Sequence, residues 1–510
     1  MTATGLTSGV PDPAPTIALP ASQPQTSLRS ISLVTGLTLL QLLLQFATQL
    51  VLAKYFGAAG EMDAYVAALA LPVVIATILS GSLGYALVPV IAERLAAASN
   101  RDAATAASQI GLYLFTLSVV ITSLVLATAR PLMAILCPGF SADEQRLTAD
   151  LLRISSLLIM ANSLIAYLNA LFHSYRHFAR PALAGVVGTL VTFGYVVLLH
   201  DRQGIFAVAW GVVFGAAVTV AILAPLFVTK LWCSAAWKLP MQAGTRRCLW
   251  LLMPLVLTAI YWRLDPLLDR FLASRLPTGN IAHMGYAWRL ISALTLIGTS
   301  GLSIVAFPAI AAHAAAVRRT ELNAELAYAL RFFLFLMVPV CVGLAGFAMP
   351  VVRLLFERGK FTAADTQAVA LLVVLYVGAI FGAGLGDLLS RTFYSLHDML
   401  VPAAISSVAF TLAAALKFLF VGSWGAGGLV AATSFYYLLN AGVLAGILLR
   451  RLSPRILAGT LGALVRAVVS SIAACLIAAV VIRLPIPAAI LLAAGCGAII
   501  YILVMRLLGD

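Results

Sequence analysis

The chain consists almost entirely of long apolar stretches that are separated by short polar connectors. A hydrocarbon core about 30 Å thick is crossed by a helix of roughly 20 apolar residues, and the stretches have that length. Hydrophobic residues make up 62% and charged residues 10% of the 510 residues, with a mean hydropathy of +1.05. Because backbone groups in lipid need internal partners, only helices or a closed barrel are possible, and uninterrupted Leu, Ala and Val runs exclude the barrel.

The pattern predicts an all-α polytopic membrane protein of about fourteen transmembrane helices. Basic residues are concentrated in the connectors after even-numbered segments, so both termini are predicted to be cytoplasmic, in an inner (plasma) membrane. The net charge of +14 is interpreted as this topology signal, not as a nucleic-acid-binding surface. The predicted segments are residues 31–53, 65–88, 108–128, 148–172, 181–199, 204–228, 249–272, 285–312, 329–356, 366–392, 400–421, 427–449, 462–482 and 485–507.

Two further features of the sequence limit the structures that the chain can form. Residues 1–28 are rich in Pro, Ser, Thr and Ala, and they are predicted to form a disordered cytoplasmic tail because they cannot bury enough apolar surface. The six cysteines are scattered without CxxC spacing, so neither a metal centre nor a disulfide framework is predicted.

The chain contains an internal repeat. LAKYFGAAGEMDAY, which begins at Leu52, parallels LASRLPTGNIAHMGYA, which begins at Leu272, an offset of 220 residues (272 minus 52). LCPGFSADEQRLTADLL at Leu136 parallels LFERGKFTAADTQAVALL at Leu355, an offset of 219 (355 minus 136). Two further pairs, which begin at residues 88 and 172, hold nearly the same offset. Such agreement predicts a duplication.

Six helices separate equivalent positions, so the two halves are predicted to have the same orientation in the membrane. We expect an N-lobe over residues 29–230, a cytoplasmic linker over 231–248, a C-lobe over 249–450 and two further helices over 451–510. Secondary transporters use parallel repeats of this kind, with substrate between lobes that rock against each other to give alternating access. The alternative is a duplicated membrane scaffold that transports nothing.

The first predicted helix carries a polar face. Gln41, Gln45, Thr48 and Gln49 are spaced at i, i+4, i+7 and i+8, which places them on one side of a helix. Polar groups inside the hydrocarbon are costly and need a reason. This face is a candidate for hydrogen bonds to sugar or phosphate oxygens, and the alternative is hydrogen bonding between neighbouring helices.

Four ionisable residues lie close together in the seventh segment: Arg263, Asp265, Asp269 and Arg270. The two acids share one helix face, and paired carboxylates in a low dielectric bind a cation or share a proton. The alternative is neutralisation by the adjacent arginines. The sequence favours neutralisation for Asp269 and a functional role for Asp265, which lies deeper in the segment.

Four more charged residues fall in later segments. Arg289 follows Trp288 and is a candidate for bidentate binding of a diphosphate, with an interfacial anchor as the alternative. Asp387 and Arg391 at i, i+4 are predicted to form an internal ion pair. Lys417 is interpreted as a side chain that snorkels toward the membrane surface.

The sequence carries no GxSxG, Walker A or HExxH motif, and no connector is long enough for a nucleotide-binding domain. We therefore predict that the chain is not an enzyme and needs no cofactor. Candidate energy sources are a gradient of Na+ or H+, the membrane potential and consumption of the transported product.

Several segments resemble the MviN/MurJ family of lipid II flippases, in the multidrug/oligosaccharidyl-lipid/polysaccharide exporter superfamily. They are FGAAGEMDAY at 56–65, LVPVIAE at 87–93, GYAWRL at 285–290, LFERGKFTAADT at 355–366 and RTFYSLHDMLVP at 391–402. The resemblance covers nearly the whole chain after residue 30. It implies two six-helix lobes around a V-shaped cavity, a C-terminal helix pair that forms a groove for a polyprenyl tail, and a lipid-linked sugar diphosphate as cargo.

The resemblance also implies site residues. Asp63 and Arg289 match positions that the family retains, and Asp265 and Asp387 lie near positions where some members bind Na+. The departures are Leu42, Thr48 and Ala76 in place of cavity arginines, and Ser80 and Trp288 in place of acids.

Together these features predict a flippase that moves an undecaprenyl-diphosphate-linked saccharide from the cytoplasmic to the periplasmic leaflet. Arg289 would bind the diphosphate, and Gln41, Gln45 and Thr48 would bind the sugars. With three cavity charges missing, a polysaccharide repeat unit is a rival cargo to lipid II. Expected partners are membrane lipids and enzymes of cell-wall or polysaccharide synthesis. A cation-coupled exporter of small amphiphiles and a non-transporting scaffold are the alternatives.

Overall fold

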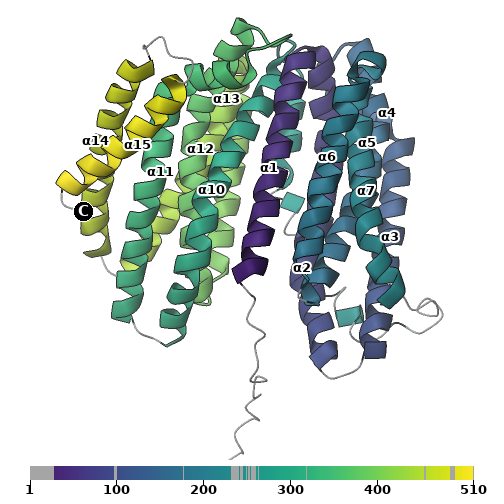
Figure 1. Cartoon of the computed structure of the whole chain (residues 1–510), viewed down its shortest axis with the longest axis horizontal. Coiled ribbons are helices and arrows are strands. Elements are labelled where there is room, and N and C mark those ends of the chain that lie inside the picture. The colour runs from purple at the N-terminus through teal and green to yellow at the C-terminus, as the bar shows by residue number, and fades with distance from the viewer. Residues whose placement is uncertain are drawn as a thin grey trace, which may run out of the picture.

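The computed structural model describes residues 28–96, 100–175, 177–230, 241, 245–247, 250, 253, 260–261, 263–316, 319–452, 455–482 and 489–508. The predicted tail, apart from residue 28, and most of the predicted linker lie outside these ranges. Every described element is a helix (Figure 1). Within these ranges, ten helices are long and apolar enough to cross a membrane.

The helices pack as two groups. In the first half of the chain they are α1 (Leu28–Phe56), α2 (Gly60–Ala96), α3 (Asn100–Ala127), α4 (Ala129–Leu136), α5 (Ala142–Ser174), α6 (Ala179–Gln203) and α7 (Phe206–Lys230). In this group α5 contacts α2, α3 and α7, and α6 lies between α1 and α7. These helices occupy the right-hand part of Figure 1, with α1 at its inner edge.

The second group begins with the short α9 (Asp265–Ala273) and continues with α10 (Asn280–Ala315), α11 (Arg319–Phe356), α12 (Ala363–Ser395) and α13 (Leu400–Arg451). Here α12 contacts α10, α11 and α13. The last pair, α14 (Arg455–Ile482) and α15 (Ala489–Leu507), packs on α11 at the outer edge of the molecule (Figure 1).

Two predicted segments, 400–421 and 427–449, both lie within α13. The helix is broken at Gly425, which has φ +54° and ψ −135°, a conformation that favours glycine. Beyond the break the two parts are antiparallel neighbours, because Ser406 donates a hydrogen bond to Asn440 at 2.9 Å and Phe410 contacts Tyr436. α13 is therefore a helical hairpin, as the sequence predicts.

The structure repeats local details at the offset found in the sequence. Gly204, between α6 and α7, has φ +56° and ψ −139°, and it lies 221 residues before Gly425 (425 minus 204). The start of α5 is a capping box of Ser141 with Glu144, and the start of α12 is a capping box of Thr362 with Asp365. These matches confirm the predicted fold class of two homologous lobes followed by two C-terminal helices.

Candidate functional site

A polar pocket of about 430 Å³ lies within the N-terminal group of helices. Its walls come from α1, α2, α5, α6 and α7, and one side chain, Arg289 of α10, reaches it from the other lobe. Its polar lining consists of Gln41, Gln45, Thr48, Gln49, Tyr65, Asn162, Asn169, Thr189, Thr192, Thr219 and Arg289. Among the described residues that line it, Arg289 is the one charged side chain.

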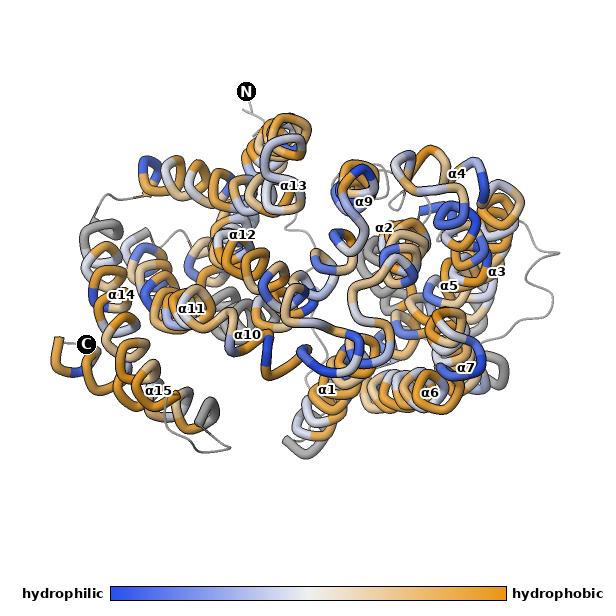
Figure 2. Tube along the Cα trace, turned by 90° about the horizontal axis from the view of Figure 1, so that it is seen from above, coloured by the Kyte–Doolittle hydropathy of each residue, from blue (hydrophilic) through white to orange (hydrophobic). Residues whose placement is uncertain are grey.

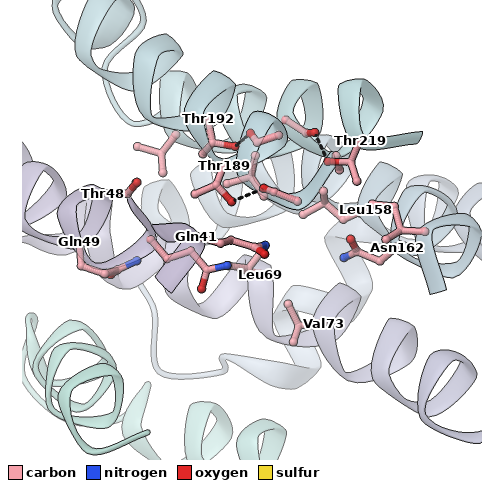
Figure 3. Close-up of a pocket in the computed structure, with 18 of the residues that line it drawn as sticks. Gln41, Thr48, Gln49, Leu69, Val73, Leu158, Asn162, Thr189, Thr192 and Thr219 are labelled. Carbon is pink, nitrogen blue, oxygen red and sulfur yellow. Dashed lines mark hydrogen bonds between the residues drawn. The ribbon is translucent and has the colours of Figure 1, made fainter. Parts of the chain in front are cut away.

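The predicted polar face of the first helix forms one wall of this pocket. Gln41, Gln45, Thr48 and Gln49 all line it, and Figure 3 shows α1 running along the pocket. Gly185 of α6 makes room for this wall, since a Cβ atom there would lie 2.7 Å from Oε1 of Gln41. The hydroxyl of Thr48 donates to the Leu44 carbonyl of its own helix. Each glutamine of this wall carries both donor and acceptor groups in its amide.

The opposite wall comes from α5, α6 and α7. Asn162 and Asn169 of α5 line the pocket, and Figure 3 shows the Asn162 amide facing the same space as Gln41. The Oδ1 atom of Asn169 is buried and has no hydrogen-bond partner within the described part of the chain. A buried acceptor of this kind favours a ligand or water that donates to it. We did not predict these asparagines, although two amides seven residues apart in an apolar segment are a usable signal.

The threonines of this wall also hold α6 against α7. Thr219 of α7 donates to the Ala184 carbonyl of α6 at 3.3 Å, and Thr192 of α6 donates to the Gly211 carbonyl of α7 at 3.1 Å. Any side chain on Gly188 or Gly215 would overlap the facing threonine. Small residues let the two backbones approach closely, so this contact fixes the position of the wall.

Arg289 faces these amides from the C-terminal group. Its side chain is exposed, and Tyr65 of α2 lines the pocket beside it. The neighbouring Trp288 packs on Tyr376 of α12, with ring centroids 5.5 Å apart, which anchors this part of α10 to its own lobe. A pocket with one guanidinium and many neutral amides suits a ligand that has one anionic group and several hydroxyl or acetamido groups.

Asp63 does not line the pocket. It is 3% exposed, and its two carboxylate oxygens accept hydrogen bonds from the backbone N–H groups of Gly279 (2.5 Å) and Ala282 (2.6 Å). These donors are at the start of α10, so Asp63 of α2 caps a helix of the other lobe, where anions are stabilised. The structure thus brings together four of the five predicted substrate-binding residues and places the fifth at a contact between lobes.

Two further hydrogen bonds join segments of the two lobes at the same end of the molecule as Asp63. The Lys360 N–H donates to the Lys54 carbonyl at 2.9 Å, and the Gly139 N–H donates to the Ser274 hydroxyl at 3.3 Å. The two bonds are equivalent under the internal repeat. Residue 139 lies 221 before residue 360, and residue 274 lies 220 after residue 54, so each lobe donates once and accepts once. The Tyr286 hydroxyl adds a 2.8 Å hydrogen bond to the Gly57 carbonyl. We call this set of contacts the inter-lobe closure.

The predicted cation-binding residues have partners in the structure. Asp387 accepts a hydrogen bond from Arg391 at 2.9 Å, which confirms the predicted ion pair. Asp265 and Asp269 pair with Lys417 of α13 at 2.6 and 2.7 Å. The interpretation of Lys417 as a snorkelling side chain was wrong, because it is 0% exposed and its ammonium group is held by both acids.

Uncharged side chains occupy the three positions where the resemblance leads one to expect cavity arginines. Leu42 is half-buried on α1, Thr48 is buried in the pocket wall, and Ala76 is buried on α2. Their side chains bring no charge to the pocket. The side chain of Ser80 lies outside the described part of the structure.

An apolar groove of about 520 Å³ lies between α11, α14 and α15. α11 bends at this point, with prolines at 339 and 350 and a non-helical Phe347. Small residues such as Gly343 and Gly497 line the groove, and the Tyr501 hydroxyl of α15 donates to the Phe335 carbonyl of α11 at 2.8 Å. The groove is lined almost wholly by apolar side chains.

Comparison with known proteins decides the family. A family model described as lipid II flippase MurJ matches residues 52–492. The chain belongs to the lipid II flippase MurJ family. The match begins inside α1, so Gln41, Gln45 and Thr48 of this MurJ-family chain precede it.

Individual relatives agree with this assignment. The lipid II flippase MurJ of Burkholderia cenocepacia is 25% identical over 411 residues, which cover 79% of this chain and 80% of that protein. The probable lipid II flippase MurJ of Bdellovibrio bacteriovorus is 26% identical over 441 residues, 84% of this chain and 83% of that protein.

Solved structures share the fold. A lipid II flippase MurJ in an inward closed conformation has a TM-score of 0.80 at 20% identity, covering 93% of this chain and 98% of that chain. An inward-facing multidrug resistance MATE family transporter of the MOP superfamily has a TM-score of 0.69 at 17% identity, covering 84% of this chain and 98% of that chain.

Proposed function

We propose that this chain is a lipid flippase that moves a polyprenyl-diphosphate-linked saccharide from the cytoplasmic to the periplasmic leaflet by alternating access. The observation that carries the proposal is the pocket, in which neutral amides of one lobe face the single guanidinium of the other. Sugar hydroxyls and acetamido groups match the amides, and a diphosphate matches Arg289. Membership of the lipid II flippase MurJ family supports the same activity.

The groove between α11, α14 and α15 is assigned to the polyprenyl tail. Its lining is almost wholly apolar, so a tail bound there would stay in apolar surroundings while the head group enters the pocket. In this reading residues 451–510 form the tail-binding part of the chain, and residues 29–230 and 249–450 form the two lobes that move.

Orientation follows from the positive-inside rule, which puts the inter-lobe closure on the periplasmic side of the inner membrane and both termini in the cytoplasm. The described contacts between lobes at this closure then correspond to a state that is shut toward the periplasm. The protein performs no chemistry on its cargo in this mechanism. Enzymes that assemble the lipid-linked saccharide on the cytoplasmic side and polymerise it outside are the expected functional partners.

The charge of the pocket bears on which lipid-linked saccharide is the cargo. Leu42, Thr48 and Ala76 leave Arg289 as the single cation among the described lining residues, so one diphosphate is matched and additional acidic groups are not. A neutral polysaccharide repeat unit therefore fits at least as well as the carboxylate-bearing lipid II.

Reconstitution into proteoliposomes tests both the flippase activity and the choice of cargo. Proteoliposomes would receive lipid II or a neutral undecaprenyl-diphosphate saccharide, and exposure of each in the opposite leaflet would be measured over time. We expect movement of at least one cargo and a loss of about tenfold or more with Arg289→Gln, because a charge-assisted hydrogen bond contributes roughly 1.5–3 kcal/mol. Arg358→Gln is the matched control, since Arg358 follows α11, is exposed, and donates to the Leu354 carbonyl in the last turn of that helix.

If neither cargo moved faster than in protein-free vesicles, the proposal would be refuted. Movement of small cationic amphiphiles, but of neither lipid, would instead support export of amphiphiles. Transport that is insensitive to Arg289→Gln would remove the diphosphate role from this residue.

A further inference from the structure

A buried lysine ties α9 to α13. Lys417 of α13 is 0% exposed, and its Nζ donates to Oδ1 of Asp265 at 2.6 Å and to Oδ1 of Asp269 at 2.7 Å. The two acids are four residues apart on α9, so their carboxylates converge on one point. The ammonium nitrogen occupies that point.

The arrangement has the form of an occupied cation site. Two carboxylates at hydrogen-bond distance from one buried point would retain a small monovalent cation if nothing else neutralised them, since isolated buried anions are very costly. Here the cation is supplied by the chain itself. Other charged and titratable groups near the carboxylates include Arg270, Tyr376, Tyr436 and Tyr437.

The position of α9 makes the neutralisation of its two carboxylates relevant to lobe movement. α9 contacts α10 and α13 of its own lobe and also α2 and α4 of the other lobe. Figure 2 shows it between α2 and α13. A free ion at the carboxylate pair would change the attachment of α9 each time it bound or left, whereas a covalently attached ammonium keeps α9 fixed to α13.

We infer that Lys417 is a tethered counter-ion that fills the cation site of Asp265 and Asp269, so that this pair neither binds nor requires free Na+. The inference revises the expectation that Asp265 serves a coupling cation. It also makes a specific claim about the variant without the lysine: removing the ammonium and its stem turns the same two carboxylates into a Na+ site.

The test uses purified full-length protein and two readouts that need no cargo, so its outcome is independent of the proposed flippase activity. These are binding of ²²Na+ and the shift in Tm between NaCl and choline chloride at equal ionic strength. For the wild type we expect no saturable ²²Na+ binding and equal Tm in the two salts. For Lys417→Ser we expect a lower Tm in choline chloride, partial recovery in NaCl, and saturable binding of about one Na+ per chain.

Two further variants separate this role from ordinary loss of an ion pair. Lys417→Ser combined with Asp265→Asn and Asp269→Asn removes the carboxylates, and its Tm should be the same in both salts. Lys360→Ser, which changes an exposed lysine, should behave as the wild type.

Three results would overturn the inference. The first is saturable Na+ binding to the wild type that Asp265→Asn abolishes, a measurement that does not depend on the stability of any lysine variant. The second is folded Lys417→Ser that binds no Na+. The third is Lys417→Ser that is unfolded in both salts, because Na+ at the carboxylates should restore part of the lost bridge.

Discussion

The inter-lobe closure should open when the charge of Asp63 is removed. Asp63→Asn keeps the size of the side chain but replaces one accepting oxygen by an NH₂ group, which would face the N–H of Gly279 or Ala282. One charge-assisted hydrogen bond is lost, at about 1.5–3 kcal/mol, and so is the attraction of the carboxylate to the start of α10. Since 1.4 kcal/mol is a factor of ten, we expect the closed population relative to the open one to fall roughly 10- to 150-fold.

Disulfide trapping measures this population. Lys54 and Lys360 are exposed, and their main chains are in contact, so cysteines at both positions in a background without the six native cysteines should cross-link rapidly. Asp63→Asn should slow the cross-linking in proportion to the loss of the closed state. Asp143→Asn is the control, because Asp143 is an exposed acid at the same end that pairs with Arg146 of its own helix. Equal cross-linking rates for Asp63→Asn and the parent would refute the reasoning.

Two other regions give independent predictions. Gly188→Ala places a methyl group against Thr219 and should destabilise the protein by about 1–3 kcal/mol, whereas Gly194→Ala on the same helix, which meets nothing within 4 Å, should not lower Tm. Equal Tm values for the two variants would contradict the close α6–α7 contact. Arg451 donates a hydrogen bond to Asp398 and lowers the pKa of that carboxyl, so the bond stabilises the fold above the ordinary aspartate pKa and its effect is lost as pH falls through the lowered value. Asp398→Asn should therefore lower Tm at neutral pH and have little effect below the lowered pKa, and a constant difference across pH would argue against the ion pair.

Sequence periodicity predicted most of the fold because a lipid environment leaves few choices. Each predicted span needs about 20 apolar residues, so segment lengths and the repeat offset were enough to give the helices and their grouping into lobes. The short α4 and α9 were missed as separate elements, because each is shorter than a span and adjoins a longer apolar stretch. The hairpin at Gly425 was predicted as two segments even though helical structure continues on both sides of the glycine.

The site was predicted less completely, and the reason is that partners distant in sequence decide what a polar residue does. The spacing on α1 correctly grouped Gln41 with its neighbours on one face, since that grouping depends only on helix geometry. Asp265 and Lys417 are 152 residues apart, and no local pattern shows that they meet. Asp63 likewise depends on the start of α10, which is 216 residues further along the chain.

The pocket and the inter-lobe closure share two helices, α2 and α10, and in the proposed mechanism these helices link cargo binding to lobe movement. Tyr65 of α2 lines the pocket and Asp63, two residues earlier, holds the closure. On α10 the closure involves Ala282, and Arg289 is seven residues further in, about 10 Å along a helix axis. A ligand shifts a conformational equilibrium only if it binds the two states differently. Arg289 is the described lining residue that comes from the C-terminal lobe, so separation of α2 from α10 would pull its guanidinium away from the amides. In the proposed mechanism we therefore expect a cargo that bridges both groups to be held tightly while the closure is shut and to be released as it opens.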